Sequence, residues 1–253
     1  MFDLENCQVP AVLAQAPAKG VSDRFTFIET RKVINDLESL GWIAVGAKGS
    51  TKPESMSAKH MVRFRSSENL EMPVNGVCPE LIITNAHNGA SSFILRAGLF
   101  RLVCSNGMIV SEAIFSSVRI RHINYSSEII RDLVLEYSKR IPEITEKVKE
   151  FQAVILTDSL KLTFARMAVA ARFENTPTVA QSIDLESLLI PTRAADKGND
   201  LFSVLNILQE KLLNAGRFEI PGKRKPREIR NVQRIITLNQ RLFDIAEAVG
   251  MLA

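Results

Sequence analysis

The sequence contains few of the residues that build metal centres and disulfide frameworks. It has three cysteines and three histidines among 253 residues. Cys7, Cys78 and Cys104 share none of the paired spacings of zinc sites, and an odd number of cysteines cannot all pair within one chain. His87 and His122 fall near the same predicted strand ends as Cys104, which is too weak a pattern to indicate a metal. We therefore expect buried, reduced cysteines, no metal or other cofactor, and a location in the cytoplasm.

Long apolar runs and the common catalytic signatures are also absent. No segment approaches the roughly 18 apolar residues that a membrane span needs, and the first residues do not resemble a secretory signal. The sequence has no serine nucleophile elbow, no phosphate-binding loop and no dinucleotide-binding glycine pattern. The polar residues Asn85, His87 and Asn88 are as typical of a turn as of a site. We expect neither membrane association nor catalysis.

Residues 80–122 predict the centre of the fold, a meander of three antiparallel strands. Apolar and β-branched runs alternate there with Asn88-Gly89 and Asn106-Gly107. Asn-Gly is the dipeptide that best adopts the positive φ angles of a two-residue type I′ hairpin turn. Two such turns therefore separate three consecutive strands.

Hydrophobic periodicity extends this prediction along the chain. Residues 24–28, 42–45 and 60–65 have strand patterns, and Thr30 is expected to cap a helix at 31–40. After residue 125 the apolar period changes from two to about 3.6, which predicts a series of helices. We expect an α+β fold in which a strand-helix-strand unit and the antiparallel β-meander pack against a C-terminal helical block. The expected regions are an N-terminal arm that packs on a neighbour (1–22), an α+β core (23–125) and a helical region (126–253) with a basic segment at 217–234.

Positive charge is modest overall but locally concentrated. The net charge is +4, and the stretch GKRKPREIRNVQR at 222–234 has six cations against the single acid Glu228. Arginines on the predicted strands can share one face, because side chains alternate along a strand. Lys48, Lys52 and Lys59 lie in or beside a predicted loop that can close over an anion, although solvated loop charge is the more ordinary explanation. The predicted nucleic-acid contacts are Arg63, Arg65, Arg96, Arg101, Arg119, Arg121, Lys223, Arg224, Lys225, Arg227, Arg230 and Arg234.

The central segment resembles a known protein family. The motifs TNAHNG at 84–89 and GLFRLVCSNG at 98–107 are similar to those of a phage- and plasmid-borne family, designated domain of unknown function 932 and often labelled phage/plasmid-like protein. A weaker similarity extends from about Asp23 to Asn239. The resemblance implies a mobile genetic element as context and does not imply a reaction.

Two functions from different classes agree with these observations. The first is a nucleic-acid-binding protein that binds or anneals single-stranded DNA in recombination, as a homo-oligomer without a cofactor. Its expected plan is similar to that of the single-strand annealing proteins of phages, in which a basic groove holds the strand; this is an analogy of architecture only. The alternative is a mobile-element protein that binds a host protein, such as an anti-defence inhibitor, through its N-terminal arm or a helix face.

Overall fold

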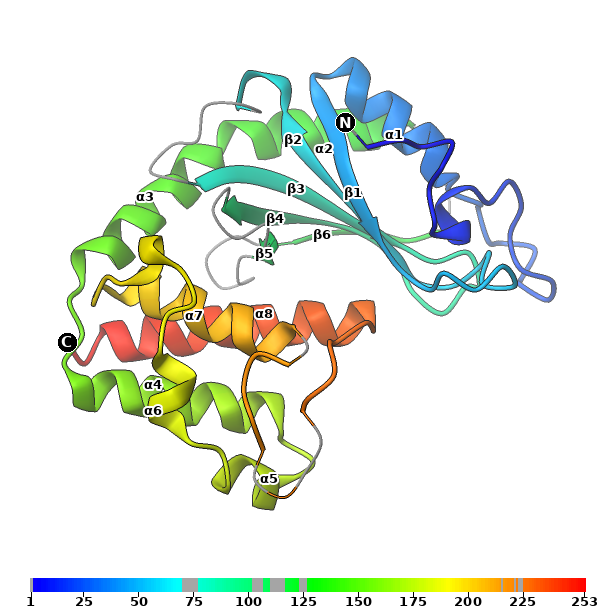
Figure 1. Cartoon of the computed structure of the whole chain (residues 1–253). Helices are drawn as coiled ribbons and strands as arrows, with labels where there is room; N and C mark the ends of the chain where they lie inside the picture. The colour runs from blue at the N-terminus through cyan, green and yellow to red at the C-terminus, as the bar shows by residue number, and fades with distance from the viewer. Residues whose placement is uncertain are drawn as a thin grey trace.

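One antiparallel sheet lies between two groups of helices in the computed structural model (Figure 1). The structure describes residues 2–69, 77–101, 107–109, 117–122, 127–214, 216–220, 222 and 225–253. Helices α1 (Thr30–Ser39) and α2 (Ser127–Lys139) cover one face of the sheet, and α7 (Leu201–Leu213) and α8 (Val232–Gly250) lie on the other. The remaining described helices are η1 (Pro10–Val12), η2 (Ser67–Asn69), α3 (Ile141–Ala153), α4 (Asp158–Arg172), α5 (Pro177–Gln181), α6 (Leu185–Leu189) and η3 (Ala194–Asp196). The α+β class predicted from the sequence is confirmed.

The sheet follows chain order. Its strands within the described residues are β1 (Trp42–Lys48), β2 (His60–Ser66), β3 (Val77–Asn85), β4 (Phe93–Arg101), β5 (Gly107–Ile109) and β6 (Val118–Ile120). The order is β1-β2-β3-β4-β5, and β6 also pairs with β4, at the opposite end from β5. The predicted third strand of the meander is therefore two short strands that share one partner.

The connection between β3 and β4 differs from the predicted two-residue turn. Residues 86–92 join the two strands, although Gly89 does have a positive φ of 72°. The chain leaves the β3-β4 strand pairing before the Asn-Gly dipeptide, because its polar side chains form hydrogen bonds with other segments. Asn85 donates to the carbonyl of Ile28 at 2.9 Å, and His87 Nε2 lies 2.9 Å from the carbonyl of Ala11. Asn106, from the second predicted turn, lies outside the described residues.

The segments before α1 also differ from prediction. Residues 24–28 are not part of the sheet, so the predicted strand there is wrong. The ring of Phe25 instead stacks on that of His122 with centroids 4.5 Å apart, and the Thr26 N–H donates to the His122 carbonyl. Thr30 does not cap α1, because its buried hydroxyl lies 2.8 Å from His60 Nε2 and accepts from Asn85. Tertiary contacts have replaced the local ones that the sequence suggested.

Part of the N-terminal segment packs on its own chain. Val9, Ala11 and Val12 are all buried in the main hydrophobic cluster. The approach is so close at Gly49 that a Cβ there would lie 2.6 Å from a methyl carbon of Val9. This contact places residues 8 and 9 beside the loop that joins β1 to β2.

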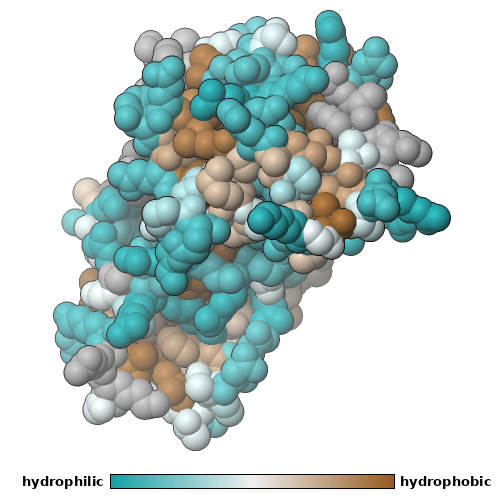
Figure 2. Space-filling view, turned by 90° about the vertical axis from the view of Figure 1, so that its right-hand side faces the viewer, coloured by the Kyte–Doolittle hydropathy of each residue, from teal (hydrophilic) through white to brown (hydrophobic). Residues whose placement is uncertain are grey.

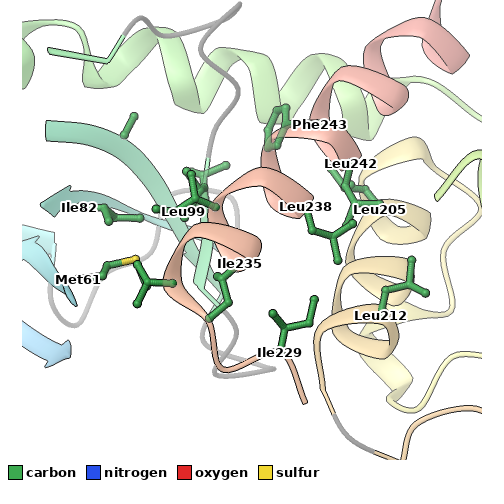
Figure 3. Packing of buried hydrophobic residues seen from close by; sticks show 14 of the residues in the cluster. Met61, Ile82, Leu99, Leu205, Leu212, Ile229, Ile235, Leu238, Leu242 and Phe243 are labelled. Atoms are coloured by element: carbon green, nitrogen blue, oxygen red, sulfur yellow. The ribbon is translucent and has the colours of Figure 1, made fainter. Parts of the chain in front are cut away.

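Helix α8 joins the sheet to the helical block. In Figure 3, Ile235 lies on the side of α8 that faces Met61 and Ile82 of the sheet, whereas Leu238 and Leu242 lie toward α7. All of these side chains are buried. The sheet face that carries Arg63 and Arg96 is therefore covered, and the first turn of α8 is fixed near the β1-β2 end of the sheet.

Side chains cap the first turns of several later helices. Thr157, Asp200 and Asn231 accept hydrogen bonds from backbone N–H groups of the first turns of α4, α7 and α8. Residues 175–198 include the short helices α5 and α6. Of the cysteines, Cys7 and Cys78 are free, and Cys104 lies outside the described residues.

Substitution of the α8 cap is expected to weaken the whole fold modestly. Asn231 Oδ1 accepts from the Arg234 N–H at 3.0 Å, so Asn231→Ala leaves that N–H without its partner. We expect a loss of about 1 kcal/mol in the free energy of unfolding, measured with urea. Asn231→Asp keeps the acceptor and should retain most of the stability; an equal loss in both variants would show that the cap contributes little.

Candidate nucleic-acid interface

A groove lies where the β1-β2 loop faces the start of α8. Its volume is about 780 Å³, and it is lined by residues 47–52, 58 and 59 on one side, 228–233 on the other, and Gln8 and Val9. Its basic side chains are Lys48, Lys52, Lys59 and Arg230, against the single acid Glu228. Figure 2 shows hydrophilic side chains spread over this side of the molecule, on both the sheet layer and the helical block. The groove is open to solvent and rich in positive charge.

Lys59 lies near cations of two strands, β4 and β6. Its Nζ donates to Gln233 Oε1 at 2.6 Å, which links the sheet to α8. Burial lowers the pKa of Lys59, and repulsion from Arg96 and Arg119 lowers that pKa further. The register places Arg119 opposite Ile94 and Ile94 opposite Thr84, whose hydroxyl accepts from Arg96. Like charges held this close favour the approach of an anion.

A second hollow adjoins the groove along residues 228–233. It has a volume of about 750 Å³ and lies between the end of α4, the segment 226–231 and the first turns of α8. Its basic side chains are Arg172, Arg227, Arg230, Arg234 and Arg241, and its acids are Glu174 and Glu228. Arg241 is paired with Glu174 at 2.5 Å. The positive end of the α8 dipole lies between the two hollows and adds to their potential.

The two hollows together form a surface that we call the basic track. The members of the basic track are Lys48, Lys52, Lys59, Arg172, Arg227, Arg230 and Arg234. Glu228 is the acid shared by both hollows, and it lies 4.0 Å from Lys48 and 3.7 Å from Arg230. Such exposed ion pairs contribute little stability, so their basic members readily exchange Glu228 for an anionic ligand.

The predicted contact residues are divided among several places. Arg227, Arg230 and Arg234 line the basic track. Arg96 and Arg119 line neither hollow, although both lower the pKa of Lys59, and Arg96 is buried. Lys225 is outside it and lies 3.5 Å from Glu219. Arg121 lines a separate hollow with His122 and the loop 88–92. Lys223, Arg224 and the side chain of Arg101 lie outside the described residues.

Arg63 and Arg65 have a different environment from the other predicted contacts. Arg63 donates two hydrogen bonds of 2.7 Å to Glu80, and Arg65 Nε donates to the same carboxylate at 2.8 Å. The Glu80 side chain is 0% exposed, whereas those of Arg63 and Arg65 are 15% and 13% exposed. The register confirms that these arginines share a sheet face with Arg96, as the alternation predicted. Their contacts with Glu80 give them a structural role.

The sequence interpretation missed Arg172 as a site residue. A basic residue in the last turn of a helix is ordinary, because it complements the helix dipole. No local pattern indicates that the chain returns beside it 55 residues later, where Arg172 Nη2 donates to the Arg227 carbonyl at 3.0 Å. The lysines of the β1-β2 loop were noticed as a possible anion site, and the structure places them in the groove.

The histidines pack among aromatic rings and backbone carbonyls. The rings of His60 and His87 have centroids 5.0 Å apart, and burial lowers the pKa of His60, His87 and His122. No cluster of three metal-ligating side chains occurs in the part of the chain that the structure describes.

Comparison with known proteins gives the family. The chain is 29% identical to UPF0380 protein YafZ and 28% identical to UPF0380 protein YfjQ, both of Escherichia coli (strain K12). Each alignment spans 252 residues, 95% of this chain and 88% of the relative. No solved structure matches the chain, and no helix among the described residues is long and apolar enough to cross a membrane. The family described as Domain of unknown function (DUF932) matches residues 18–243, so the chain belongs to this family.

Proposed function

We propose that the protein binds nucleic acid along the basic track, with single-stranded DNA as its preferred partner. The observation that supports this proposal is the adjoining pair of hollows, whose described lining residues include eight cations and two acids. An elongated positive surface fits a polyanion better than a small ligand, because each neutralised phosphate releases counterions and adds affinity.

The size of the hollows favours a single strand. Each has a volume of 750 to 780 Å³, in the range of sites that enclose one small ligand. One or two nucleotides of a single strand fit such a space, whereas a duplex is too broad to enter and meets only the rim. Phe173 is the one aromatic residue among the described lining residues, so few bases can stack on the protein. The contacts therefore go mainly to phosphates, and binding does not depend on the base sequence.

This mode of binding suits the pairing of strands in recombination. Phosphates held by lysine and arginine leave the bases free to meet a complementary strand, and no cofactor or nucleotide is consumed. We propose that the protein works in the cytoplasm of a host cell, as a homo-oligomer in which basic tracks of neighbouring copies extend one another.

A second candidate function is binding of a host protein. Exposed apolar side chains favour it: Ile155, Met251 and Leu252 are 65%, 84% and 69% exposed. In Figure 1 the C-terminus lies beside the link between α3 and α4, which contains Ile155. The burial of Val9, Ala11 and Val12 removes part of the N-terminal arm as a contact. A protein partner that binds this apolar end, with no DNA binding at low salt, would favour this function.

Charge removal on the basic track tests the first proposal. The variant Lys52→Gln/Arg230→Gln/Arg234→Gln changes three exposed side chains and should weaken binding to a single-stranded oligonucleotide by about tenfold or more at low salt. The slope of log affinity against log salt should become shallower by about 2, because three phosphate contacts are lost.

A matched variant controls for net charge. Arg131→Gln/Lys139→Gln/Arg166→Gln removes the same charge from exposed positions on α2 and α4, outside the basic track. It should retain the wild-type salt slope. Equal slopes in all three proteins would count against the basic track as the binding surface.

A further inference from the structure

Two arginines of the basic track lie close together without an acidic partner. Burial and, to a smaller extent, the charge of Arg234 together lower the pKa of Arg172 to about 10. Arg172 Nη2 donates to the Arg227 carbonyl, while its Nε is buried and has no hydrogen-bond partner. The group remains charged at neutral pH, so the fold holds a partly desolvated guanidinium beside a second cation.

The acids near this pair are directed elsewhere. Glu174 binds Arg241, and Glu228 lies near Lys48 and Arg230. Among the described residues, neither Arg172 nor Arg234 forms an ion pair with a carboxylate. The same hollow is lined by the polar residues Asn175, Thr176 and Thr237, which can donate further hydrogen bonds to an anion.

We propose that Arg172 and Arg234 form a binding site for a phosphomonoester, supplied either by the end of a bound strand or by free phosphate. As far as a strand end is concerned, this inference rests on the proposed function. A phosphomonoester has a charge of about −1.5 to −2 at neutral pH and three terminal oxygens. It therefore matches two guanidinium forks, whereas one internal phosphodiester leaves about one positive charge unbalanced.

The surroundings favour the end of a strand at this position. The Arg241 and Glu174 pair lies at the side of the hollow formed by the end of α4 and the body of α8. A strand that enters from the Lys52 and Lys59 side passes Arg230 and then meets Arg172 and Arg234. Beyond them the carboxylate of Glu174 disfavours a further phosphate.

Oligonucleotides that differ only at their ends test this site. One sequence with a 5′-phosphate, a 3′-phosphate or only hydroxyl ends is titrated by fluorescence anisotropy. We expect about tenfold tighter binding of one phosphorylated form, as for added charge-assisted hydrogen bonds. The preference should be lost in Arg172→Gln and in Arg234→Gln, and kept in Arg166→Gln, which removes an exposed arginine from the same helix α4. Arg234 is exposed, so its variant tests the site even where Arg172→Gln alters the fold.

Inorganic phosphate separates this inference from the proposed function. Phosphate should raise the thermal midpoint of the wild type above that in chloride of equal ionic strength, and should not do so in Arg172→Gln or Arg234→Gln. Phosphate binding without DNA binding supports the site and overturns the proposed function. DNA binding that is equal for phosphorylated and hydroxyl ends, together with no shift of the thermal midpoint by phosphate, overturns the site. The proposed function is then unaffected.

Discussion

Glu80→Gln is expected to lower the free energy of unfolding by about 3–5 kcal/mol. The substitution keeps the shape of the side chain but removes the negative charge that Arg63 and Arg65 share. Glu80 is fully buried, and both guanidinium groups approach its oxygens within 2.7 to 2.8 Å. Two partly buried cations would then repel each other without a carboxylate between them. Urea unfolding of the wild type and the variant measures the difference.

A triple variant shows whether the stability lost in Glu80→Gln comes from the unbalanced arginine charges or from poorer packing. Arg63→Met/Glu80→Leu/Arg65→Met replaces all three charges by apolar groups and should recover much of the stability lost by Glu80→Gln. A loss below about 1 kcal/mol for Glu80→Gln would contradict the structural role of this cluster.

Acid is expected to destabilise the protein through its histidines, well before most carboxylates titrate. Burial lowers the pKa of His60 to about 4 in the folded protein. Between about pH 6.5 and pH 4 the unfolded chain therefore binds a proton at this histidine that the folded protein does not bind. The stabilisation is complete above about pH 7 and is lost as the pH falls through 6.5 toward 4. For His60 alone the expected loss between pH 7.5 and pH 5 is about 2 kcal/mol. His87 and His122 act in the same direction.

The hydrogen bonds of His60 fix its neutral tautomer. Nδ1 lies 2.9 Å from the Ala58 carbonyl and must carry the proton, so Nε2 accepts from the hydroxyl of Thr30. His60→Gln lacks a group that titrates in this range. Its free energy of unfolding should therefore change less between pH 7.5 and pH 5, whatever its stability at pH 7.5. An unchanged pH dependence would show that His60 is not the titrating group.

The sequence predicted what depends on local pattern. Alternating apolar residues predicted the β2, β3 and β4 strands, and an apolar period of about 3.6 predicted the series of later helices. The six cations of residues 222–234 are visible as a run, and three of the four that the structure describes line the basic track.

The features that were missed depend on contacts between distant segments. The β3-β4 loop is long because Asn85 and His87 bind the N-terminal part of the chain. Glu80 looks like an isolated acid in an apolar strand until the register places Arg65 opposite it. Arg172 becomes part of a site only when the segment after α7 returns beside α4. Such contacts follow from tertiary packing, which local propensity does not determine.

The salt dependence of binding to a single-stranded oligonucleotide tests the central claim most directly. The account predicts affinity that falls steeply and linearly on logarithmic axes as salt rises, with tighter binding to single strands than to a duplex of equal length. Loss of the three charges at Lys52, Arg230 and Arg234 should flatten that line, and the matched variant on α2 and α4 should not. Absence of binding to either form of DNA at low salt would contradict the account.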